Sequence, residues 1–191
     1  MIIDPSTLGS DTVYKLMSNT IFPRPIAWIS TEGEGGLNLA PYSYFIPVST
    51  VPPCVMVSFG RHENGGLKDS IQNILETGRA TISLAQDLHA ERIEHSAESF
   101  DYGVSEPERC GIDMKKIAEG YPPMVADAKA ALLCSLHQTT ELKESTMTIA
   151  FLKIERFYYA EGVVDERYRV HLDNIGRVGR EYLVEAKRVR V

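Results

Sequence analysis

The chain has 191 residues, of which 43% are hydrophobic and 24% charged. This composition and length indicate one globular domain over residues 1–191 and exclude low-complexity, collagen-like and disordered chains. The formal net charge of −6 predicts a surface that repels nucleic acid, so no nucleic-acid partner is expected. No apolar run approaches the ~18 residues of a membrane span. Residues 1–5 lack the features of a signal peptide. We therefore expect a cytoplasmic protein with no membrane partner.

In chain order, the first half of the sequence predicts short strands separated by turns. Apolar and β-branched residues fill 25–31, and the glycine-rich segment 32–36 predicts a hairpin turn into a return strand from 37 to about 44. Prolines in and beside 48–53 favour a loop there, because proline cannot donate to a strand ladder. Further strands are expected at 54–59, 80–85, 130–139, 146–158 and 161–164.

Two segments predict helices. Ile71, Ile74 and Leu75 fall on one face of a helix over 69–77, which Gly78 ends. A second helix is expected over 88–98. The stretch 99–124, rich in proline and glycine, predicts irregular structure, and 167–191 predicts a charged strand or tail. Many strands with few helices and no βαβ alternation predict a mainly β fold with helices (α+β), organised as a barrel.

Most common catalytic and metal-binding motifs are missing from the sequence. It contains no GxGxxG after a strand, no GxxxxGK[ST], no HExxH and no GxSxG. The three cysteines form no CxxC, and the five histidines show no metal-ligand spacing. These absences argue against Rossmann and P-loop nucleotide sites, hydrolases and metalloenzymes, and we predict no metal site.

Two segments of the first half suggest ligand contacts. Arg24 lies between Pro23 and Pro25, which hold it in an extended conformation where a cation could meet an anion. The alternative is a solvated arginine in a stiff loop. In the segment 38–45, small and polar residues alternate with bulky ones, and Pro41 removes a backbone donor. Such a strand could present its backbone to a planar ligand, or be an ordinary edge strand.

Two further segments could bind phosphate. Lys68, Ser70 and free backbone amides meet at the predicted start of the 69–77 helix, and Ser58 and Arg61 could approach them. The alternative is an ordinary capped helix with a solvated lysine. The segment 176–180 is a glycine-rich, locally basic loop, or else a simple surface turn. Together, phosphate ligands, a strand for a flat ring and no acid, base or nucleophile suit a phosphorylated redox cofactor that carries its own chemistry.

The residues of these segments resemble the flavin reductase-like proteins of the FMN-binding split-barrel superfamily, in the flavoredoxin-type branch. The resemblance extends over about residues 14–182 and is carried by 22–31, 38–45, Lys68-Asp69-Ser70 with Asn73, and 176–179. Three positions depart from the family pattern: Ile46 replaces a common asparagine, Ser70 replaces threonine but keeps its hydroxyl, and Arg180 replaces a common glycine.

The resemblance implies a split β-barrel that forms a homodimer with FMN at each subunit interface. Lys68 and Ser70 would hold the phosphate with help from Ser58 and Arg61. Pro25, Ile26 and Ala27 would flank the isoalloxazine opposite the strand from Asn38 to Ser43. The implied FMN contacts are Arg24, Asn38, Ala40, Ser43, Ser58, Lys68, Ser70 and Asn73, with Arg177 and Gly179 reaching the site from the partner chain.

The resemblance further implies an NAD(P)H-dependent flavin reductase, in which hydride passes from the nicotinamide of NADH or NADPH to the flavin and no side chain acts as a catalyst. Two alternatives stay open: an electron carrier whose acidic surface steers a redox partner protein, and a non-catalytic FMN-binding module. In each case Arg24, Arg61, Lys68 and Arg177 are expected to form a local cationic set around one phosphate.

Overall fold

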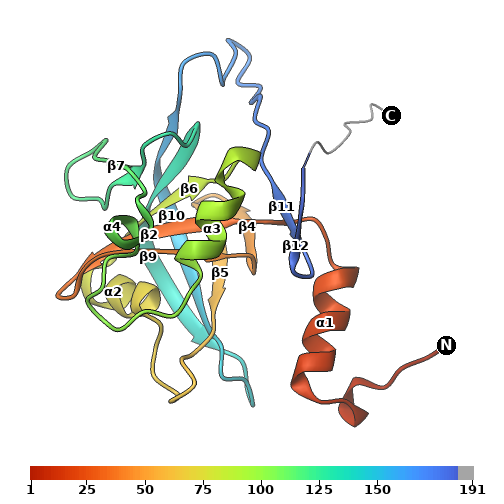
Figure 1. Cartoon of the computed structure of the whole chain (residues 1–191). Helices are drawn as coiled ribbons and strands as arrows, with labels where there is room; N and C mark the ends of the chain where they lie inside the picture. Colours follow the sequence, from red (N-terminus) through yellow and green to blue (C-terminus); the bar gives the residue numbers. More distant parts are fainter. Residues whose placement is uncertain (185–191) are drawn as a thin grey trace.

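The computed structural model describes residues 1–184, and most of these residues lie in or around one antiparallel sheet (Figure 1). The sheet has seven strands in the order β3-β2-β6-β9-β10-β5-β4. Each strand pairs antiparallel with its neighbour, and the register between β9 and β10 shifts at two places. In that order the strands are Gly36–Tyr42, Ala27–Gly33, Arg79–Leu84, Ala130–Glu141, Thr148–Tyr159, Pro53–Phe59 and Phe45–Thr50.

The sheet is rolled around a core, because side chains from strands near both of its edges meet in one cluster. Ala27 and Ile29 of β2 share this cluster with Phe45 of β4 and with buried residues of β5, β6, β9 and β10. The intervening residues of β2, such as Trp28, face the other way into a second cluster. The alternation along β2 therefore buries both faces of the strand, as expected for side chains that point to opposite sides.

Helices and short strands cover the two faces of the sheet. Helix α2 spans Asp69–Thr77, as predicted, and puts Ile71 and Ile74 into the first cluster. Gly78 ends it with a left-handed backbone at φ 69°. The predicted second helix is shorter than expected, since α3 spans Ala90–Ser96 after a single 3-10 turn at Asp87–His89.

Several elements differ from the sequence predictions. The predicted loop at 48–53 is wrong for its first half, because β4 runs through Pro47 to Thr50. The strand lies at the sheet edge and its register shifts after Pro47, and proline is tolerated at edges and bulges. The irregular stretch contains α4 (Glu106–Cys110), β7 (Met114–Lys115) and β8 (Met124–Val125). The segment 161–164 forms a turn rather than a strand.

A second, small sheet joins the two ends of the described chain. It has the order β1-β11-β12, with bounds Arg24–Pro25, Gly176–Val178 and Glu181–Leu183. Helix α1 (Ser10–Thr20), which was not predicted, lies beside the β11–β12 hairpin at one side of the molecule (Figure 1). Part of the predicted C-terminal tail, residues 185–191, lies outside the described residues.

The architecture confirms a mixed α+β fold made mostly of strands. None of the helices within residues 1–184 has the length and hydropathy to cross a membrane.

Candidate functional site

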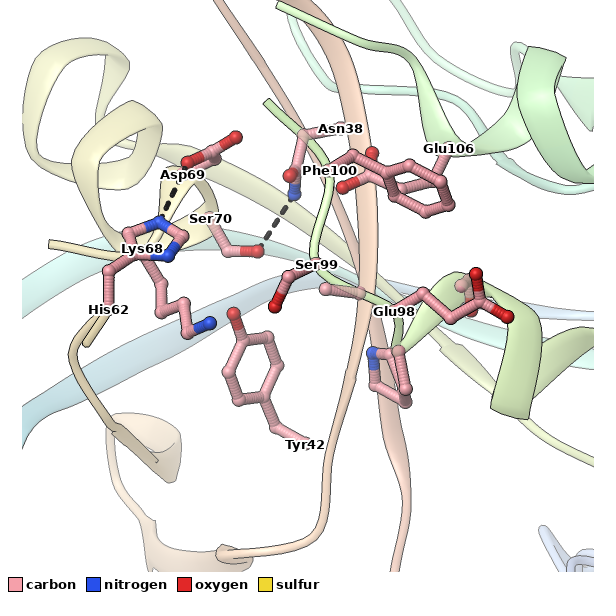
Figure 2. Close-up of a pocket in the computed structure, with 14 residues that line it drawn as sticks. Asn38, Tyr42, His62, Lys68, Asp69, Ser70, Glu98, Ser99, Phe100 and Glu106 are labelled. Atoms are coloured by element: carbon pink, nitrogen blue, oxygen red, sulfur yellow. Dashed lines mark hydrogen bonds and ion pairs between the residues drawn. The ribbon is translucent and has the colours of Figure 1, made fainter. Parts of the chain in front are cut away.

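A hollow of about 120 Å³ opens at the amino end of α2. We call it the α2 hollow. It lies between strand β3, helix α2 and the loop that follows α3, and Figure 2 shows polar side chains from all three directed into it. The side chains that matter most here are Asn38, Tyr42, His62, Lys68, Ser70 and Glu106.

The start of α2 leaves its backbone donors available to a ligand. Lys68 is the N-cap residue, and it provides no side-chain hydrogen bond to the first turn. The first N–H groups of a helix have no partner within the helix and carry a partial positive charge. Among residues 1–184, nothing pairs with the Lys68 ammonium. An unpaired cation therefore lies at an uncapped helix start, an arrangement that suits an anion.

Buried polar groups form the wall of the α2 hollow. The Asn38 side-chain amide forms a hydrogen bond with the Ser70 hydroxyl at 2.8 Å, and both side chains are buried. Glu106 of α4 is also buried, and its carboxylate accepts the backbone N–H of Leu39 at 3.0 Å. Burial raises the pKa of Glu106, and the nearby Asp69 carboxylate raises it further.

Tyr42 and His62 complete the hollow. Burial raises the pKa of the Tyr42 hydroxyl well above its ordinary value, so at neutral pH it is a hydrogen-bonding alcohol. His62 lies 3.3 Å from the carboxylate of Asp69. The hollow therefore offers a cation, the hydroxyls of Tyr42 and of three serines, a histidine and three carboxylates. The carboxylates belong to Asp69, Glu98 and Glu106.

A second hollow, of about 380 Å³, surrounds Arg24 and is mostly apolar. We call it the Arg24 hollow. It is lined by Met17, Ile21, Arg24, Ser43, Ile46 and Ser58, among others. The Arg24 side chain donates to the Ser43 hydroxyl at 2.6 Å and to the Gly179 carbonyl at 3.4 Å. Its Nε is buried without a partner among the described residues, and no carboxylate there pairs with it.

A third hollow of about 180 Å³ lies beside the other two and shares lining residues with each of them. We call it the middle hollow. It shares Tyr42 with the α2 hollow and Ser43 with the Arg24 hollow, and Ile26 forms part of its wall. The three hollows thus follow one another along β3, from the start of α2 to Arg24. The predicted residues Ala40, Lys68 and Ser70 lie at one end of this groove, and Arg24, Ser43 and Ser58 lie at the other.

The expected cationic set around one phosphate is not what the structure shows. Arg61 and Lys68 share an outer hollow of about 750 Å³, where Arg61 is tied to the Thr146 carbonyl at 3.1 Å and to Glu141 at 3.4 Å. Arg24 and Arg177 lie together at the other end, as register partners of β1 and β11. The four cations therefore form two separate pairs.

Arg177 and Gly179 also differ from their prediction. The predicted basic loop is strand β11 followed by a turn, and Gly179 has a left-handed backbone at φ 52°. Within a single chain, Arg177 forms an ion pair with Glu94 and stacks on Tyr182, 4.4 Å from its ring centroid. Within one chain, both residues therefore lie near Arg24, and a contribution from a partner chain stays a prediction.

Three predicted contacts lie away from the groove. Asn73 is buried beneath the β2–β3 hairpin, where it donates to the Thr31 hydroxyl at 3.1 Å. Ala27 belongs to the barrel core. Pro25 is exposed and pairs with Gly176. These residues shape the surroundings of the groove but do not line it.

Glu106 and His62 were not predicted as site residues. Glu106 lies in the stretch expected to be irregular, 67 positions along the chain from its partner Leu39. No local pattern signals such a contact. A hint was available for His62, which precedes the predicted phosphate segment by six positions. Within the described residues, no cluster of three or more His, Cys, Asp or Glu side chains is placed to hold a metal ion.

Comparisons with known proteins agree with this architecture. The flavin reductase like domain family matches residues 17–176. A protein of Aquifex aeolicus is 30% identical over 92% of this chain and 91% of its own length. The structure is similar to nitrilotriacetate monooxygenase component B from Bacillus cereus, with 26% identity, a TM-score of 0.92 and coverage of 100% of this chain and 98% of that one.

A second solved structure is also similar over its whole length. The 2-nitrobenzoate 2-nitroreductase NbaA of Pseudomonas fluorescens has 28% identity and a TM-score of 0.88, with coverage of 100% of this chain and 95% of that one. The predicted split-barrel fold is thus confirmed. The match over residues 17–176 shows that the chain belongs to the flavin reductase like domain family.

Proposed function

We propose that this protein binds FMN and is an NAD(P)H-dependent flavin reductase of the cytoplasm. One observation carries the proposal: adjacent hollows along β3 place an unpaired cation at an uncapped helix start at one end and an apolar hollow with a buried, unpaired guanidinium nitrogen at the other. A ligand that suits both ends has a phosphate at one end and a flat, largely apolar ring system with polar edges at the other. FMN has this form.

The residues of the groove fit such a ligand. Lys68, Ser70 and the first-turn N–H groups of α2 would hold the phosphate, because they combine charge with directed donors. The ring would lie along β3 toward Ser43. The Nε of Arg24 would then gain the partner that it lacks among the described residues, since a buried donor without an acceptor is costly.

The groove offers positioning rather than side-chain chemistry. The flavin, when bound, supplies the acceptor for a hydride from the nicotinamide of NADH or NADPH. The chain's own residues would bind and orient the cofactor, and the Arg24 guanidinium would place a fixed positive charge near the ring. A chain that positions a flavin, with the flavin supplying the redox chemistry, is consistent with the flavin reductase like domain family.

We further propose that the protein acts as a homodimer. The Arg24 hollow is bordered by exposed apolar side chains, among them Met17, Ile21 and Ile46. Clustered apolar surface around a binding groove is typical of an interface. A second copy of the chain laid over this border would cover the ring end of the groove. Light scattering tests this: a dimer is expected, and a monomer that binds FMN with full affinity would contradict it.

The experiment for the reaction is anaerobic. The purified protein is saturated with FMN, and NADH or NADPH is added in separate runs while the visible absorbance of the flavin is followed. We expect rapid bleaching with at least one nucleotide, far faster than with free FMN. Bound flavin that neither nucleotide reduces would contradict the reductase proposal and favour an electron carrier that serves a redox partner protein.

A further inference from the structure

The buried Glu106 faces the α2 hollow through Asn38. The Asn38 amide can take two orientations that differ in which of its atoms meets Glu106. In the first, its nitrogen donates to the Ser70 hydroxyl at 2.8 Å and its oxygen faces the Glu106 carboxyl. In the second, its nitrogen donates to Glu106 at 3.1 Å, and its oxygen accepts from Ser70 at 2.8 Å and from the Leu39 N–H at 3.3 Å.

The charge of Glu106 decides between the two orientations. An ionised carboxylate only accepts hydrogen bonds, so it favours the second orientation, in which it meets the amide nitrogen. A neutral carboxylic acid has one O–H to donate, so it can meet the amide oxygen of the first orientation. Its other oxygen keeps the Leu39 N–H, which lies at 3.0 Å.

The orientation of Asn38 in turn sets what Ser70 offers to a ligand. In the second orientation the single proton of the Ser70 hydroxyl is used on Asn38, so only lone pairs face the hollow. In the first orientation Ser70 accepts from Asn38, so its O–H, which also lies within reach of the Tyr42 oxygen, can turn to donate to a ligand. A phosphate accepts hydrogen bonds and does not donate when fully ionised. A phosphate that accepts a hydrogen bond from Ser70 therefore requires the first orientation.

The charges around the hollow favour the same outcome. The titratable and charged groups that line the hollow with Glu106 or interact with it electrostatically come from several elements: Tyr42 of β3, His62 before α2, Lys68 and Asp69 at its start, Glu98 after α3 and Cys110 of α4. Three carboxylates thus share the hollow with one lysine. A phosphate that enters adds more negative charge, and neutralising the most buried carboxylate is the least costly response.

We propose that Glu106 is a positioning residue that, through Asn38, sets the direction of the Ser70 hydroxyl, so that binding of the FMN phosphate in the α2 hollow takes up one proton at Glu106. The inference rests on the proposed function, since it needs a phosphate at this site. Burial, the largest cause, raises the pKa of Glu106 and so lowers the cost of this proton uptake.

The test is calorimetric titration of FMN into the protein at several pH values, in buffers of different ionisation enthalpy, for the wild type and for Glu106→Gln. The glutamine mimics the neutral acid, because its amide can donate to Asn38 and accept from Leu39. Above the pKa of Glu106 in the free protein, we expect the wild type to take up about one proton more per FMN than the variant. The FMN dissociation constant of the wild type, divided by that of Glu106→Gln, should then rise about tenfold for each pH unit.

Three comparisons separate this effect from others. The phosphate of FMN has its own pKa near 6, but it titrates equally with both proteins. In His62→Gln the extra proton uptake should persist, which excludes His62 as its source. Riboflavin, which lacks the phosphate, should bind without extra uptake. Equal proton uptake by the wild type and by Glu106→Gln would overturn the inference, as would loss of the uptake in His62→Gln.

A measurement on the unchanged protein avoids any effect of substitution on folding. Above the pKa of Glu106 in the free protein, the infrared difference spectrum between the wild type with and without FMN should show a new band from a protonated carboxyl group, and its absence there would overturn the inference. FMN binding without proton uptake would contradict only the role of Glu106. Failure to bind FMN at any pH would overturn the proposed function and this inference together.

Discussion

Replacing the buried Arg24 by methionine should have opposite effects on the free protein and on FMN binding. Arg24 is 6% exposed, and no carboxylate among the described residues pairs with it. Burial of an ion costs several kcal/mol. Arg24 donates hydrogen bonds to Ser43 and Gly179, and its guanidinium lies 5.7 Å from the Tyr44 ring centroid. These contacts stabilise the folded protein by roughly 2–4 kcal/mol and so offset part of the burial cost. We expect Arg24→Met to leave the unfolding free energy unchanged or to raise it by up to about 2 kcal/mol.

The same substitution should weaken FMN binding. A charge-assisted hydrogen bond contributes about 1.5–3 kcal/mol, so its loss weakens the affinity roughly 10- to 100-fold. The assay pairs thermal unfolding of the free protein with FMN titration. The matched control is Arg169→Met, which removes an exposed ion pair to Asp165 and should change stability by less than about 1 kcal/mol. A destabilised Arg24→Met protein with unchanged FMN affinity would refute the reasoning.

Three further predictions follow from other parts of the structure. Lys68→Ala should weaken FMN binding about 10- to 100-fold but leave riboflavin binding and the melting temperature unchanged, because the ammonium has no partner among the described residues. Gly33→Ala should lower the melting temperature, since the added methyl would lie 2.2 Å from the side-chain oxygen of Asn73, an overpacking that costs roughly 1–3 kcal/mol. Burial lowers the pKa of His89 below its ordinary value of 6.5, so unfolding takes up a proton below that pH. The free energy of unfolding should therefore fall as the pH drops from 7 toward 5. In His89→Gln it should fall less over the same pH range.

Each of these three predictions has an outcome that would contradict it. Equal losses of FMN and riboflavin affinity in Lys68→Ala would place the lysine away from the phosphate. An unchanged melting temperature for Gly33→Ala would show that Asn73 moves aside at no cost. Identical pH profiles for the wild type and His89→Gln would assign the acid sensitivity to other groups.

The sequence predicts those parts of the fold that depend on local patterns. Helix α2 has the predicted bounds because its apolar spacing, its first turn and the terminating Gly78 all lie within ten residues of sequence. The strand at 45–50 was missed because proline tolerance depends on edge position, which only the assembled sheet defines. Helix α1 has no buried apolar residue to signal a core-facing stripe.

In the candidate site too, the residues that a local pattern marks could be predicted, and the contacts between distant segments could not. Lys68 and Ser70 could be predicted because a helix start is visible in the sequence. The partners of Asn38 could not, since Ser70 and Glu106 reach it from distant segments. Likewise, the sequence shows that Arg24 and Arg177 are cations, but the pairing of β1 with β11 decides that they lie together rather than beside Lys68.

The most direct test of the account is a binding titration of FMN with the purified protein, followed by the visible absorbance and fluorescence of the flavin. We expect saturable binding of one FMN per chain with a perturbed flavin spectrum. An unperturbed spectrum at protein concentrations well above those of the flavin would contradict the central claim that the groove along β3 is a flavin site.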